Sequence, residues 1–227
     1  GIGLLRKPDR GQLRQAEAAF RRVIELNRPE GALNLARVLL REGRLDEAVD
    51  ALQSASTQGA YPWSIDWFGG LVDLQNGNLD TAIDAFNALT QTNYPEARAR
   101  GFDFSLDYRL QNTLAQTLFE RSKLAASNRM EVEWLDRAAN HYQQSLQIDP
   151  ENVTAHYGLA QVYARLDRST QAEKHRQLHE KYRRDDNAHD LALASARRSD
   201  PAANHASEAV VIYELQRRGA YGLPVDR

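Results

Sequence analysis

The chain has 227 residues, a formal charge of −2 at pH 7 and no cysteine. This charge provides no basic stripe for the phosphates of nucleic acid, so we expect no nucleic-acid partner. The lack of cysteine excludes disulfides, thiolate catalysis and cysteine-based zinc sites, and leaves the compartment open. No apolar run approaches the roughly 18 residues that a membrane span needs, so we expect a soluble chain without membrane insertion.

The first residues are expected to form a truncated helical pair. Pro8 ends a first helix, Gly11 makes the turn, and Ala16-x3-Phe20 opens a second helix that continues to Pro29. Because the chain starts within the first helix and without Met, we expect it to be a fragment of a longer polypeptide.

The next segment contains one pattern twice in the same register. Leu-Arg-Glu-Gly-Arg-Leu-Asp-Glu-Ala (40–48) returns as Leu-Gln-Asn-Gly-Asn-Leu-Asp-Thr-Ala (74–82), which is 34 residues further on. A unit of this length, with a Gly turn and then Ala-x3-aromatic, resembles the tetratricopeptide repeat, a helix–turn–helix unit that stacks into a solenoid.

The period then breaks and returns. The next Ala-x3-aromatic is Ala138-x3-Tyr142, 56 residues after Ala82, and the extra residues fall in 92–107 and around 123–133. Residues 92–107 are expected to be an irregular surface excursion whose Phe102 and Phe104 dock on the solenoid. Ala172 restores the 34-residue spacing after Ala138.

We therefore predict an all-α, right-handed solenoid of about five helical pairs over residues 1–184, followed by a C-terminal capping helix and tail over 185–227. The cap is expected near 187–198, and 210–213 fits either a helix or a strand. The ending 204–215 also resembles, more weakly, the C-terminal repeat region of large bacterial secreted multi-domain proteins. The compartment stays open between a bacterial cytoplasm and a periplasm. The tail from 200 to 227 either covers the groove or extends the cap.

The resemblance implies a concave groove lined by the first helix of each pair, and hence a non-catalytic scaffold that binds a peptide or protein segment there. The partner could also be another domain of the same polypeptide. The residues predicted to line the groove are Leu33, Arg37, Arg41, Trp63, Trp67, Leu71, Arg109, Asn112, Gln116, Tyr157 and Gln161. The alternative is that the tryptophans pack between the second and third pairs, since most aromatic residues on helices are core residues.

The rival function is a metal-binding or enzymatic module built on His175 and His179, which are four residues apart on one predicted helix. The chain could equally be the regulatory domain of a larger multi-domain enzyme. No nucleophile elbow, phosphate-binding loop or dinucleotide motif occurs in the sequence. We therefore predict no catalytic residue, no metal and no cofactor.

Overall fold

The computed structural model describes residues 10–26, 28–99 and 103–183. These residues form helices and connecting turns, and no strand occurs within the described ranges. The helices are α1 (Arg10–Ile24), α2 (Pro29–Glu42), α3 (Leu45–Thr57), α4 (Pro62–Asn76), α5 (Leu79–Gln91), α6 (Pro95–Ala99), η2 (Phe104–Leu106), α7 (Tyr108–Ser122), α8 (Asn128–Ile148), α9 (Val153–Arg165) and a last helix over 169–183.

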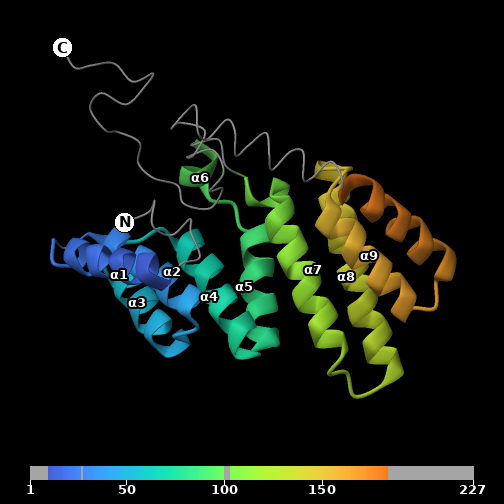
Figure 1. Cartoon of the computed structure of the whole chain (residues 1–227), viewed down its shortest axis with the longest axis horizontal. Helices are drawn as coiled ribbons and strands as arrows, with labels where there is room; N and C mark the ends of the chain where they lie inside the picture. The colour runs from blue at the N-terminus through green and yellow to red at the C-terminus, as the bar shows by residue number, and fades with distance from the viewer. Residues whose placement is uncertain (1–9, 27, 100–102, 184–227) are drawn as a thin grey trace, which may run out of the picture.

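The helices stack in chain order, from α1 at one end of the molecule to the helix 169–183 at the other (Figure 1). Each long helix packs against the next one along the chain, and α5 packs directly against α7. The first helices of the pairs also touch one another, α2 against α4 and α7 against α9. This arrangement confirms the predicted all-α solenoid.

The turns within the pairs are set by glycine. Gly43 ends α2 with φ of 72° and Gly77 ends α4 with φ of 80°, a left-handed conformation that side chains with a Cβ disfavour. The next residue closes each turn, because Arg44 N–H donates to Leu39 O at 2.9 Å and Asn78 N–H donates to Asp73 O at 2.8 Å. The two copies of the sequence pattern thus fold in the same way.

The solenoid core is built on small residues where two helices cross. Ala48, Ala82 and Ala138 have 0% exposure and Ala172 has 2%. An alanine at each of these positions lets the two backbones approach closely, and the larger neighbours Leu52, Phe86 and Tyr142 fill the space beside it. The predicted repeat register is therefore correct for these positions.

The segment 92–107, which interrupts the 34-residue period, contains some regular structure. The segment expected to be irregular contains the short helix α6 and the 3-10 turn η2, which packs against α5. Phe104 is 4% exposed, so its predicted docking is confirmed, whereas Phe102 lies outside the described residues. The second insertion lengthens α8 to 21 residues, compared with 13 in α3 and α5, and the α7–α8 hairpin projects past its neighbours (Figure 1).

Two further expectations concern the ends of the chain. Gly11 was expected at a turn but lies inside α1, which already begins at Arg10. The cap at 187–198, the segment 210–213 and the tail 200–227 lie outside the described residues. Among the residues that are described, no helix has both the length and the apolar character that crossing a membrane requires.

Candidate functional site

The eleven residues predicted to line the groove all lie on the four first helices. Leu33, Arg37 and Arg41 belong to α2, Trp63, Trp67 and Leu71 to α4, Arg109, Asn112 and Gln116 to α7, and Tyr157 and Gln161 to α9. They differ in how far their side chains reach the surface, and this separates residues available to a partner from residues that hold the fold together.

Arg37 joins α2 and α4 within the predicted site. Asn34, which is 2% exposed, donates from Nδ2 to Glu30 O at 2.7 Å and accepts at Oδ1 from Arg37 Nη1 at 2.8 Å. The Arg37 guanidinium lies over the Phe68 ring, with 5.6 Å between Cζ and the ring centroid. The guanidinium is therefore held by a hydrogen bond on its own helix and a cation–π contact with the next pair.

Asn34 and Phe68 were not among the predicted groove residues. The signal was present, because the two residues are 34 apart and thus occupy the same position in successive repeats. A residue of one repeat lies beside its equivalent in the next, so Arg37 can bridge from one to the other.

Trp63 does not reach the surface, contrary to the expectation of an exposed apolar stripe. Its side chain is 1% exposed and stacks on Tyr61 with ring centroids 4.5 Å apart. Tyr94, 5.5 Å away, and Phe104, 6.5 Å away, cover it from the segment inserted after α5. Trp63 is therefore a core residue that attaches the inserted segment to α4, whereas the alternative interpretation placed it between the second and third pairs.

Two more apolar members of the predicted set are also buried. Trp67 is 9% exposed and its ring lies 5.6 Å from that of Phe86, while Leu33 is 6% exposed. Leu71 is half-buried. The apolar centre of the predicted groove is thus mostly core, because the hydrophobic side chains are used where α2, α4 and α5 meet.

The second half of the site lies on α7 and α9. Asn112 is 8% exposed and donates from Nδ2 to Asn152 Oδ1 at 2.9 Å, the same oxygen that accepts from Ala155 N–H and caps α9. Asn112 therefore positions α9, and no local sequence signal indicated its partner 40 residues away. Gln116 is exposed, Gln161 is half-buried and Tyr157 is 52% exposed.

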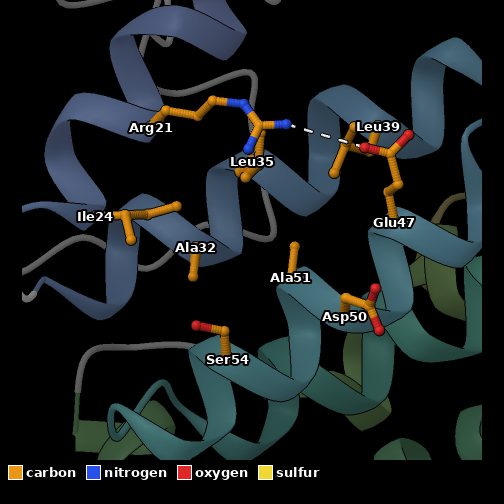
Figure 2. Close-up of a pocket in the computed structure, with 9 residues that line it drawn as sticks. All are labelled: Arg21, Ile24, Ala32, Leu35, Leu39, Glu47, Asp50, Ala51 and Ser54. Atoms are coloured by element: carbon orange, nitrogen blue, oxygen red, sulfur yellow. Dashed lines mark ion pairs between the residues drawn. The ribbon is translucent and has the colours of Figure 1, made fainter.

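A hollow in the described residues lies on another face of α2, between α1 and α3, and contains none of the predicted groove residues (Figure 2). Its volume is about 260 Å3. Its lining is mainly apolar, with Arg21 and Glu47 3.9 Å apart across it, and consists of Arg21, Ile24, Ala32, Leu35, Leu39, Glu47, Asp50, Ala51 and Ser54.

The histidines do not form the pair that the rival function needs. His175 Nδ1 lies 2.9 Å from Nδ1 of His156, a buried residue of α9, while His179 Nδ1 lies 3.1 Å from Val153 O. No group of three or more His, Cys, Asp or Glu side chains suited to a metal ion occurs in the part of the chain that the structure describes. His175 and His179 thus have separate hydrogen-bond partners, although they are four residues apart on one helix.

The stacked helical pairs and the residues on their first helices define a tetratricopeptide-type solenoid. The chain belongs to the family described as "Protein kinase G tetratricopeptide repeat", which matches residues 9–192. No curated protein matches the chain.

Solved structures agree with this fold. "MamA RS-1 ArsTM double mutant" is 18% identical with a TM-score of 0.59, over 79% of this chain and 89% of that one. "MamA 41-end from Desulfovibrio magneticus RS-1" is 18% identical with a TM-score of 0.58, over 78% and 88%. "Human IFIT1 dimer with PPP-AAAA" is 16% identical with a TM-score of 0.57, over 74% of this chain and 35% of that one. At these identities the likeness extends to the fold alone.

Proposed function

We propose that this chain is a non-catalytic scaffold that binds a peptide or protein segment along the surface of its first helices α2, α4, α7 and α9. A tetratricopeptide-type fold supports a role in protein interaction in general. The described residues supply no group suited to a metal, and the sequence has no nucleophile motif, so nothing favours a catalytic role over binding.

The observation that carries the proposal is the fixed orientation of Arg37. A side chain held by Asn34 and by the Phe68 ring loses little rotamer freedom when a partner arrives, and such preorganised arginines contribute strongly to binding. Tyr157, 52% exposed on α9, offers a large amphipathic surface, and aromatic residues of this kind are frequent binding hot spots. Gln116 and Gln161 add amides that can pair with the main chain of an extended segment.

A second candidate follows from the family. Its name joins this repeat type to a protein kinase, which favours the chain as a regulatory module whose partner segment belongs to a kinase of the same polypeptide. The two candidates use the same surface and differ in whether the partner is joined covalently to the chain.

Selection from a random peptide library displayed on phage, with the full chain immobilised, tests the proposal. Selected peptides should bind Arg37→Ala and Tyr157→Ala at least about tenfold more weakly than the parent chain. Arg129→Ala is the matched control, because Arg129 is 90% exposed and belongs to α8, which is not one of the first helices. Asp50→Arg probes the hollow between α1 and α3.

Two results would contradict the proposal. If the selected peptides lose affinity for Asp50→Arg while Arg37→Ala and Tyr157→Ala bind normally, the binding surface is the hollow between α1 and α3. If all four variants bind like the parent, the first helices are not a binding surface for peptides.

A further inference from the structure

The last described helix, 169–183, is held against α9 by a contact between two imidazole rings. His156 Nδ1 and His175 Nδ1 are 2.9 Å apart, so one nitrogen must donate and the other must accept. His156 Nε2 lies 3.1 Å from the carbonyl oxygen of Pro150, which can only accept. In the neutral pair, His156 therefore carries its proton on Nε2 and accepts at Nδ1 from the Nδ1–H of His175.

This assignment limits how many protons the contact can take up. A first extra proton can be taken up on Nε2 of His175, because Nδ1 of His156 keeps the lone pair that accepts the hydrogen bond from Nδ1–H of His175. A second extra proton removes that lone pair, and two N–H groups with two positive charges then face each other across the gap. The contact is compatible with at most one added charge.

The surroundings of the pair provide little compensation for that charge. His156 is 3% exposed and stacks on Tyr182 with centroids 5.5 Å apart, and the His175 ring lies 5.6 Å from that of Tyr163. Burial disfavours the charged form of His156, and the Pro150 carbonyl and the carboxylate of Asp149 offset this only in part, so the pKa of His156 stays below its ordinary value. The other titratable groups around it are the phenols just named and the basic groups Lys174 and His179, both of which oppose a further positive charge on His156.

We propose that the His156–His175 contact is a proton-sensitive latch, which keeps the helix 169–183 docked on α9 at neutral pH and releases it in mild acid, because the imidazoles take up protons more readily once the helix has opened. The released helix would uncover the side of α9 that holds Tyr163, whose ring lies 5.6 Å from that of His175. It would also remove His179, whose ring lies 5.2 Å from that of Tyr157, from the exposed aromatic side chain of the proposed binding surface. The latch does not depend on peptide binding, so it can be tested without a partner.

The direction of the pH effect follows from burial. Burial, together with His156 and Lys174, lowers the pKa of His175 to about 4, and burial also lowers the pKa of His156. A histidine whose pKa is lower in the docked state than in the open state favours docking at high pH, and this contribution is lost as the pH falls below the open-state value of about 6.5. Between about pH 7 and pH 5, His175 alone should raise the opening constant roughly twentyfold, and His156 should add to this.

Hydrogen exchange on the full chain, corrected for the intrinsic pH dependence of the exchange rate, measures this opening. Amides of 170–183 should lose protection between about pH 7 and pH 5, a range in which exposed carboxylates stay ionised, while amides of α3 and α5 keep theirs. The double variant His156→Gln and His175→Gln should abolish the local pH dependence, because an amide can donate and accept but does not titrate. His141→Gln is the matched control, since this half-buried histidine of α8 bonds to Gln111 and lies outside the pair.

Nitrogen-15 NMR of the unmodified chain decides the matter even if the double variant does not fold. At about pH 7 the proton should be on Nε2 of His156 and on Nδ1 of His175, and both rings should titrate below the ordinary histidine range. The latch is excluded if both rings titrate near 6.5, or if protection in 170–183 falls only together with that of α3 and α5.

Discussion

The ring of Phe86 lies directly over Gly70, so close that a Cβ on Gly70 would meet Phe86 Cε1 at 2.6 Å. The two residues belong to the two helices of one repeat, α4 and α5, and only a glycine allows this approach. The adjacent Gly69 is different, because a Cβ there would meet nothing within 4 Å. The packing of Phe86 therefore requires a glycine at position 70, whereas no neighbouring atom requires one at position 69.

Alanine at these two positions should change stability in opposite directions. Gly70→Ala forces the Phe86 ring to move within a packed core and should lower the free energy of unfolding by about 1–3 kcal/mol. Gly69→Ala should raise it by about 0.5–1 kcal/mol, because alanine restricts the unfolded chain and adds no clash. Urea unfolding of both variants measures the difference, and a shift of the same sign in both would contradict the packing described here.

Ala82→Leu should overpack the crossing of α4 and α5. Ala82 is completely buried, and extra carbons in such a site cost about 1–3 kcal/mol. Ala88→Leu on the same helix is the control, because Ala88 is exposed and can accommodate a larger side chain. A thermal melt of Ala82→Leu that matches the parent would mean that the helices do not cross at this residue.

Tyr94→Phe should make stability more dependent on pH. The Tyr94 hydroxyl donates to Asp66 Oδ2 at 3.1 Å, and burial raises the pKa of Asp66 above its ordinary value. A carboxyl with a raised pKa stabilises the fold while it is protonated, and that contribution is lost as the pH rises through the folded-state pKa. Removing the donor disfavours the charged form further, so the loss should reach about 1–2 kcal/mol at neutral pH and be smaller below about pH 4.

Urea unfolding of Tyr94→Phe at neutral pH and below about pH 4 measures the loss of stability at each pH. Tyr157→Phe, at an exposed tyrosine, is the control. An equal loss at both pH values would show that the Tyr94 hydroxyl contributes nothing specific to the charged form of Asp66.

Arg44→Ala should lower the melting temperature at low salt. Arg44 joins three helices, because its guanidinium pairs with Glu17 at 2.9 Å, Glu42 at 2.9 Å and Glu47 at 2.6 Å. Its hydrogen bond is the main cause that lowers the pKa of Glu17, so Glu17 stabilises the fold above its unfolded pKa and this contribution is lost as the pH falls. The variant should therefore show a weaker acid destabilisation than the parent.

Salt provides the check on Arg44. About 1 M NaCl screens charges beyond roughly 3 Å and should reduce the difference between the variant and the parent. Arg129→Ala, which removes an exposed i,i+4 pair with Glu133, should have a smaller effect at either salt concentration. If Arg129→Ala lowered the melting temperature as much as Arg44→Ala, the ion pairs by which Arg44 joins three helices would add no stability beyond that of an exposed pair.

The parts of the fold that the sequence predicted are those set by short-range rules. Gly43 and Gly77 adopt the left-handed turn conformation, Pro29 and Pro62 stand in the first turn of α2 and α4, and Ala82 lies at a helix crossing. Each requirement is met by a residue and its neighbours within one repeat. A pattern that occurs twice at a spacing of 34 residues is therefore sufficient to predict it.

The site was harder to predict, because the exposure of a helix face depends on what covers it. The helical position of Trp63 suggested a surface residue. In the structure Tyr94 and Phe104, which follow some 30 to 40 residues later in the chain, pack on it and bury it. Asn112 looked like a groove amide, but its partner Asn152 lies 40 residues away in another repeat. Neither relationship leaves a periodic trace in the sequence, whereas the polar residue Gln116 is exposed and Arg37 is half-buried.

The stacking of each helix on the next one along the chain also determines how the molecule forms. Contacts between residues close in sequence close only short loops, and chains dominated by them fold on the microsecond-to-millisecond scale. In a stack of this kind, folding can start at any pair and spread to its neighbours. The aromatic contacts of Trp63 with Tyr94 and Phe104 connect α4 to the segment before α7, so they add a second connection across the break in the period beside the packing of α5 on α7. A chain that lacks them should spread its folding across this break more slowly than across the regular junctions.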